Sequence, residues 1–217
     1  MTGRGKGRSH KPARQNVVLV FGEDSNDRDA LKEFILALRP GADFYVAPRR
    51  KPQIQLKDVK PEQLPGRVAA ICKVVRAELV DNNVVAIVVH QDADAVESAH
   101  EEIITRLEAA FDSAGYKQSL VACPAWEMET WLMLWPEAIA KHVPSWRPLS
   151  VNGKNVGMIS DSKEYLKRAL RSPAVNRDYR ESDAPAIAKI VRAEGLIDAP
   201  AAKSASYDTF RKKVLAL

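Results

Sequence analysis

The chain has 217 residues, 46% hydrophobic and 28% charged, which is the composition of an ordinary globular domain. The apolar content is too high for a disordered chain, and no apolar run approaches the ~18 residues of a membrane span. The basic start of the sequence lacks the apolar stretch of a secretory signal. Cys72 and Cys123 each lie in an apolar run, which favours buried, reduced thiols. We therefore expect a cytoplasmic protein with no membrane association.

The net charge of +5 comes from residues 1–15, which contain five basic residues and no acidic one. This stretch is also rich in glycine and has no apolar periodicity, so we predict a disordered tail. Such a tail could bind nucleic-acid phosphates without specificity, or it could only solubilise the start of the chain. We assign residues 1–15 to this tail, 16–145 to an α/β domain and 146–217 to a helical extension packed on the same domain.

Short, β-branched apolar runs alternate with longer segments of helical periodicity. The predicted strands are 16–22, 43–47, 84–90 and 119–123. The predicted helices are 27–39, 67–79, 95–114, 128–142, 161–170, 184–194 and 207–217. The proline-rich stretch 48–65 and residues 146–160 are expected to be loops. Strands that alternate with helices indicate a mostly parallel, Rossmann-like sheet flanked by helices, with a small helical C-terminal extension.

Acidic residues follow two of these strands. Glu23 and Asp27 come after residues 16–22, and Asp92 and Asp94 come after 84–90. Ligands of parallel sheets bind beyond the carboxyl ends of the strands, and Mg²⁺ prefers carboxylate oxygens. The spacing therefore favours a metal site, if the two strands are neighbours. The alternative is that Asp27 and Asp94 only cap the helices that follow.

At these residues the sequence resembles a TOPRIM domain, the Mg²⁺-binding fold of topoisomerases, primases and OLD-type nucleases. The matching segments are VLVFGEDSND, with Glu23 and Asp27, and AIVVHQDAD, with Asp92 and Asp94. Many TOPRIM domains have glycine directly after the glutamate, where this chain has Asp24.

The resemblance extends to uncharacterised bacterial TOPRIM-like proteins of similar length. Their Glu-x-Trp-Leu segment is similar to residues 129–132, and a C-terminal Ser-x-x-x-Phe-like element is similar to SASYDTF at 204–210. Proteins of this class are often linked to phage defence, sometimes beside a partner ATPase. The resemblance thus implies the fold, a role in defence and such a partner.

The resemblance implies a Mg²⁺-dependent nuclease, with Mn²⁺ as the alternative ion. Asp92 and Asp94 would hold the metal, and Glu23 would be a further ligand or the general acid/base. Glu129 follows the last strand and could bind a second metal, or it could complement the dipole of its own helix. Lys163 lies in a stretch similar to a lysine-bearing segment of the family, which favours a catalytic role.

Two basic clusters could contact the phosphates of DNA or RNA, and both could equally be solvated faces. One cluster is Arg49, Arg50 and Lys51; the other is Lys163, Lys167, Arg168 and Arg171. The tryptophans at 131 and 135 share a helix face and could stack bases, although packing in the core is the usual role of such residues. His90 could act at the site or be a hydrogen-bonded histidine at a strand end.

Two other functions stay open. The chain could be a non-catalytic subunit that binds nucleic acid or a partner ATPase. Nucleotide-sugar transferases also place Asp-x-Asp after a strand, but nothing in that class accounts for Glu23. The sequence leaves open DNA versus RNA and the oligomeric state, a homo-oligomer included.

Overall fold

The computed structural model describes residues 13–51, 55–173 and 177–217. In these residues four strands form one all-parallel sheet with the order β2-β1-β3-β4. The strands are β1 (Asn16–Phe21), β2 (Phe44–Pro48), β3 (Asn83–His90) and β4 (Ser119–Ala122). The predicted α/β class, with a parallel Rossmann-like sheet and flanking helices, is confirmed.

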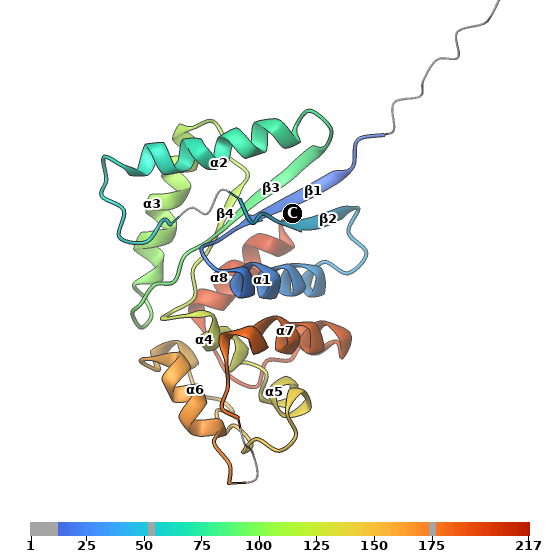
Figure 1. Ribbon diagram of the computed structural model, residues 1–217, viewed down its shortest axis with the longest axis vertical. Coiled ribbons are helices and arrows are strands. Elements are labelled where there is room, and N and C mark those ends of the chain that lie inside the picture. The colour runs from blue at the N-terminus through green and yellow to red at the C-terminus, as the bar shows by residue number, and fades with distance from the viewer. Residues whose placement is uncertain (1–12, 52–54, 174–176) are drawn as a thin grey trace, which may run out of the picture.

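Eight α-helices are present among the described residues. They are α1 (Ser25–Leu38), α2 (Leu64–Glu78), α3 (His100–Ser113), α4 (Met128–Leu132), α5 (Pro136–His142), α6 (Ser162–Leu170), α7 (Ala184–Ala193) and α8 (Ala205–Leu215). In Figure 1, α2 and α3 lie on one side of the sheet and α1 and α8 on the other, with α4 to α7 beyond them. None of the described helices is long and apolar enough to cross a membrane.

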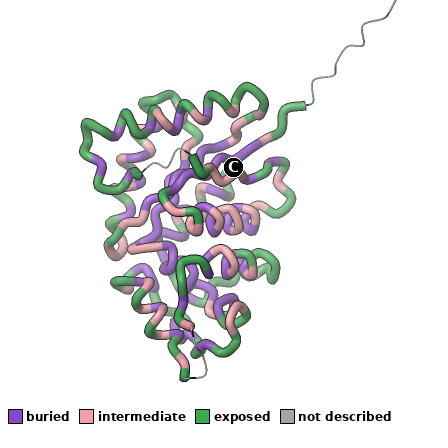
Figure 2. Tube along the Cα trace, viewed as in Figure 1, coloured by how far each residue is buried: buried purple, intermediate pink, exposed green. Residues whose placement is uncertain are grey.

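The strands are buried on both faces, as their unbroken apolar runs predict. Successive side chains point to opposite faces, so Val17 and Leu19 join the core under α2 and α3, whereas Val18 and Val20 join the core under α1. Figure 2 shows the strands as the buried centre of the molecule. Cys72 and Cys123 are both free and buried, as expected.

The larger core also contains the aromatic residues of the C-terminal half. Trp131 stacks on Phe210 with ring centroids 4.9 Å apart, and Trp135 meets Tyr207 edge-on at 5.1 Å. Both tryptophans are at most 2% exposed, so they are core residues and not a platform for bases. Ser206 accepts hydrogen bonds from the indole of Trp131 and from the backbone of the loop after β4. This contact fixes α8 beside the carboxyl end of the sheet.

Two predicted helices differ from the observed ones. The predicted helix 128–142 is two helices, because Pro136 cannot continue a helix and instead begins α5. The predicted helix 95–114 begins only at His100. Residues before it are held in an irregular segment, where the carboxylate of Glu97 accepts hydrogen bonds from Ser204 Oγ (2.6 Å) and from Ser206 N (2.9 Å).

The predicted disordered tail lies, up to residue 12, outside the described residues. Its last residues contact the sheet: Arg14 donates to the carbonyl of Val80 at 3.1 Å, and the carbonyl of Gln15 accepts from Asn83 N at 2.8 Å. The first ordered contacts of the chain therefore precede β1.

Candidate metal centre

The sheet order places the ends of β1 and β3 side by side. After β1 the chain crosses to β2 at one edge, and after α2 it returns to the other side of β1 to form β3. The crevice between two strands whose connections run in opposite directions is the usual ligand site of such sheets. Asp27, in the first turn of α1, and His90 with Asp92, at the end of β3, meet at this crevice.

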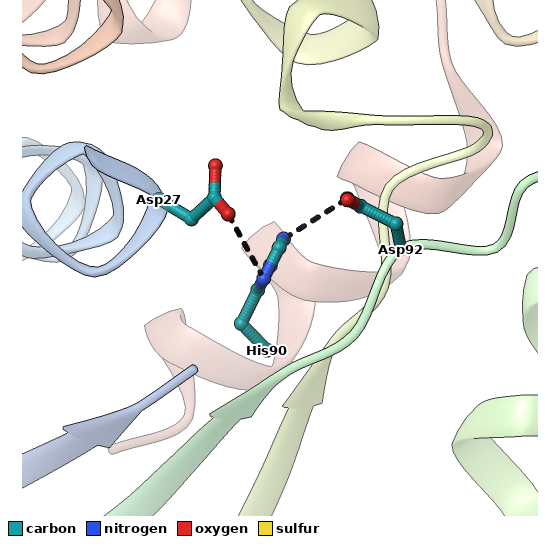
Figure 3. Close-up of side chains that lie close together, drawn as sticks. All are labelled: Asp27, His90 and Asp92. Atoms are coloured by element: carbon teal, nitrogen blue, oxygen red, sulfur yellow. Dashed lines mark ion pairs between the residues drawn. The ribbon is translucent and has the colours of Figure 1, made fainter. Parts of the chain in front are cut away.

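The imidazole of His90 lies between two carboxylates (Figure 3). Its Nδ1 is 3.6 Å from Asp27 Oδ2, and its Nε2 is 3.2 Å from Asp92 Oδ1. One ligand atom from each of the three residues lies within 4.8 Å of the others, a separation that one cation could bridge. No other group of at least three acidic, histidine or cysteine side chains in the described part of the chain meets this condition.

The turn after β1 is built to bring these side chains together. Asp24 caps α1 by accepting a hydrogen bond from Asn26 N. The buried guanidinium of Arg28 donates to the carbonyl of Gly22 at 2.5 Å. A Cβ atom at Gly22 would lie 3.1 Å from His90 Cβ, so the glycine allows β1 to pass close to the histidine.

The site is electrostatically coupled. Burial alone lowers the pKa of His90, but the charges of Asp27 and Asp92 outweigh it and raise this pKa to about 9. Burial raises the pKa of Asp27 to about 6, although the charge of His90 opposes that shift. At neutral pH the ring is therefore an imidazolium between two acids. A metal ion needs neutral imidazole, so its binding would release the proton of His90.

The three residues suit a metal ion. His90 Nε2 and Asp92 Oδ1 are buried and, despite their short separation, neither forms a hydrogen bond with a described residue. Buried polar atoms without hydrogen bonds are costly in a fold and call for an explanation, such as an ion. Two carboxylates and one imidazole are common ligands of divalent metals. The cluster of Asp27, His90 and Asp92 could thus hold a metal ion.

The cluster lines a cleft of about 350 Å³. The cleft is mostly acidic, and it contains several of the residues singled out from the sequence. Its polar and charged lining comprises Glu23, Asp24, Asp27, Lys57, His90, Gln91, Asp92, Glu127, Glu129, Lys163 and Glu181. Such a cleft repels anions unless cations are present in it or beside it.

Glu23 and Glu129 lie in the cleft but outside the three-residue cluster. The carboxylate of Glu23 is exposed and accepts a hydrogen bond from Gln55 Nε2. Glu129 is 3% exposed and accepts from the hydroxyl of Tyr179 at 3.0 Å. Burial and the charge of Glu127 raise its pKa to about 7. Their predicted roles as ligands stay predictions.

Lys163 stands at the rim of the cleft between two acids. Its ammonium is 3.2 Å from Glu127 Oε1 and 2.8 Å from Glu181 Oε1. Burial alone lowers the pKa of this lysine, but the two carboxylates outweigh it and raise the pKa well above its usual range. Lys163 is therefore a permanent cation suited to bind a phosphate, and not a base.

The structure separates Asp94 from Asp92. Asp94 has a left-handed backbone (φ 48°) and is ion-paired with Lys57, and it does not line the cleft. The alternative prediction, that Asp27 and Asp94 cap helices, is wrong. Asp24 is the N-cap of α1, and α3 begins well after Asp94.

The two basic clusters differ in their placement. Arg49 is ion-paired with Glu78 at 2.5 Å, and neither it nor the exposed Arg50 and Lys51 lines the cleft. Lys167 lies on α6, the same helix as Lys163, and is paired with Glu164 at 2.7 Å. Only the cluster on α6 therefore reaches the metal centre.

Sequence reasoning mentioned His90 without placing it among the ligands. The available signal was its position, as the last residue of the most apolar strand and two residues before Asp92. No family model matches this sequence, and no curated protein or solved structure is significantly similar to it. The functional argument therefore rests on the residues themselves.

Proposed function

We propose that this protein is a metal-dependent nuclease that hydrolyses phosphodiester bonds of nucleic acid. The observation that carries the proposal is the convergence of Asp27, His90 and Asp92 in a cleft at the carboxyl end of the sheet. The sequence resemblance of this region to TOPRIM domains points to the same chemistry, and a role in phage defence beside a partner ATPase belongs to this proposal.

The ligand set bears on the choice of ion. Carboxylates suit both Mg²⁺ and Mn²⁺, whereas an imidazole nitrogen suits transition metals better than Mg²⁺. We therefore expect Mn²⁺ to bind more tightly than Mg²⁺ at Asp27, His90 and Asp92. A bound ion would polarise a phosphoryl oxygen and lower the pKa of an attacking water.

The chain's own residues would do the remaining work. The permanent cation of Lys163 can hold a non-bridging phosphate oxygen at the rim of the cleft. Glu23 is exposed to solvent in the same cleft and can accept a proton from water. Arg28 keeps the turn between β1 and α1 in place through its bond to Gly22.

One observation favours a second function. The imidazolium of His90 already balances the charges of Asp27 and Asp92, so the cluster can persist without metal. A non-catalytic subunit that binds nucleic acid or a partner would need no more than this. Such a subunit would keep its binding when the cluster is altered.

The test is a cleavage assay of the full chain on plasmid DNA, single-stranded DNA and tRNA, with Mn²⁺, Mg²⁺ or EDTA. The wild type is expected to cleave at least one substrate with metal only, and Asp92→Asn to reduce the rate at least a hundredfold. Asp112→Asn removes an acid of the same kind from the exposed end of α3 and is expected to cleave like the wild type. The absence of both cleavage and metal binding in the wild type would refute the proposal.

A further inference from the structure

A second hollow continues from the metal centre along α6. It has a volume of about 720 Å³ and shares Lys163 and Glu181 with the metal-centre cleft. We call it the α6 groove. It is lined by Lys163, Glu164, Lys167, Arg168, Arg171, Asp178, Tyr179, Arg180 and Glu181. The two hollows thus meet at the ion pair of Lys163 with Glu181.

The charge of the α6 groove is opposite to that of the cleft. Five of its lining side chains are basic and three are acidic. Among the described residues, Arg168 and Arg180 form no ion pair, and both are exposed. Beyond them lies a further hollow lined by four arginines and one aspartate. Its charged residues are Arg147, Arg168, Arg171, Arg177 and Asp178.

The ion pairs that exist in the groove are weak. Arg171 meets Asp178 at 3.2 Å with side chains 71% and 49% exposed, and Lys167 meets Glu164 within one helix. Exposed pairs of this kind contribute little to stability, so a phosphate can replace the carboxylate without a large penalty. The groove can therefore present most of its cations to an anionic ligand.

The spacing of the cations suits a chain of phosphates more than a single anion. Lys163, Lys167 and Arg171 recur every four residues along one side of α6, a rise of roughly 6 Å per step. A row of evenly spaced cations beside an acidic metal site matches a strand whose backbone lies along the row while one phosphate enters the cleft. A small anion would use only one of these positions.

We propose that the α6 groove binds the phosphate backbone of a nucleic-acid strand and directs it to the metal centre. The inference deepens the proposed function and rests on it for the direction of the strand. Binding in the groove does not require the metal, so it can be tested separately from cleavage. The remaining residues of the loop cluster, Arg50 and Lys51, take no part in it.

The test measures fluorescence anisotropy of labelled single-stranded DNA, RNA of the same sequence and duplex DNA in EDTA, over a range of salt concentrations. The full chain with Arg168→Glu and Arg180→Glu is compared with one carrying Lys73→Glu and Arg76→Glu. The second pair lies on exposed positions of α2 and changes the net charge equally. Figure 1 shows α2 and α6 at opposite ends of the molecule.

We expect the α6 pair to weaken binding at least tenfold and to reduce the slope of log K against log salt by about 2, one for each phosphate contact. The α2 pair is expected to stay within about twofold of the wild type. Comparison of the three nucleic acids then identifies the preferred strand. Equal losses in both pairs, no loss in the α6 pair, or no binding by the wild type at low salt would overturn the inference.

Two further variants keep the test decisive. Arg168→Gln with Arg180→Gln removes the charge without adding acids, and a thermal melt like that of the wild type shows that it is folded. Asp92→Asn is expected to bind like the wild type in EDTA while failing to cleave. If binding depends on the α6 groove but no condition gives cleavage, the groove stands and the nuclease proposal fails.

Discussion

The two ends of the same sheet treat their polar groups differently. At the amino end, Asn16 donates to Asp43 at 2.9 Å and Asn83 donates to Asn16 at 2.6 Å, all at the surface. At the carboxyl end, His90 and Asp92 are close and buried, yet neither of their facing atoms forms a hydrogen bond. Groups that only finish a strand satisfy one another, whereas groups at the carboxyl end are arranged for a ligand.

The largest difference between the two ends is expected in the pH dependence of stability. Burial raises the pKa of Glu129 from 4.5 to about 7, so between these values the unfolded chain is ionised while the folded chain keeps the proton. Fewer protons on the unfolded state mean that stability falls as pH rises through this window, by about 3 kcal/mol in all. Glu129→Gln removes this loss.

Chemical unfolding at pH 4 and pH 8 measures the effect. The difference in unfolding free energy between Glu129→Gln and the wild type should grow by about 3 kcal/mol in favour of the variant. Asp43→Asn, at the exposed amino end, should show no comparable growth. A constant difference for Glu129→Gln would mean that this carboxyl is not kept protonated by burial.

The next largest effect compares the two ends of β3. His90→Ala removes a ligand and is expected to weaken Mn²⁺ binding at least a hundredfold, because even the indirect supports of metal ligands are worth 10- to 100-fold. Asn83→Ala, at the other end of the strand, should leave the affinity unchanged. Titration calorimetry with MnCl₂ measures both variants. Unchanged Mn²⁺ affinity in His90→Ala would place the metal elsewhere.

The smallest effect is expected at the amino end itself. Asn16→Ala deletes the hydrogen bonds to Asp43 and Asn83, which are exposed to water and contribute at most about 1 kcal/mol to stability. Urea unfolding measures the loss, and Mn²⁺ binding should not change. A loss of more than about 2 kcal/mol would show that this end is not merely a finished surface.

Much of the fold could be predicted because the signals are local. The run before Glu23 and the run before His90 are apolar throughout, which requires strands buried on both faces. The predictions failed where distant contacts override local preference. Residues 95–99 have a helical pattern, but Glu97 is held by Ser204 and Ser206 from the other end of the chain.

The sequence by itself determined which residues end the strands, because a buried strand can place acids only beyond its last apolar residue. The acids after β1 and β3 were therefore visible without a structure. Only the tertiary structure decided which of them meet. The sheet order makes β1 and β3 neighbours, the left-handed backbone of Asp94 lets it pair with Lys57, and His90 fills the space between Asp27 and Asp92. These outcomes depend on strand pairing and side-chain packing between distant segments, which local periodicity does not encode.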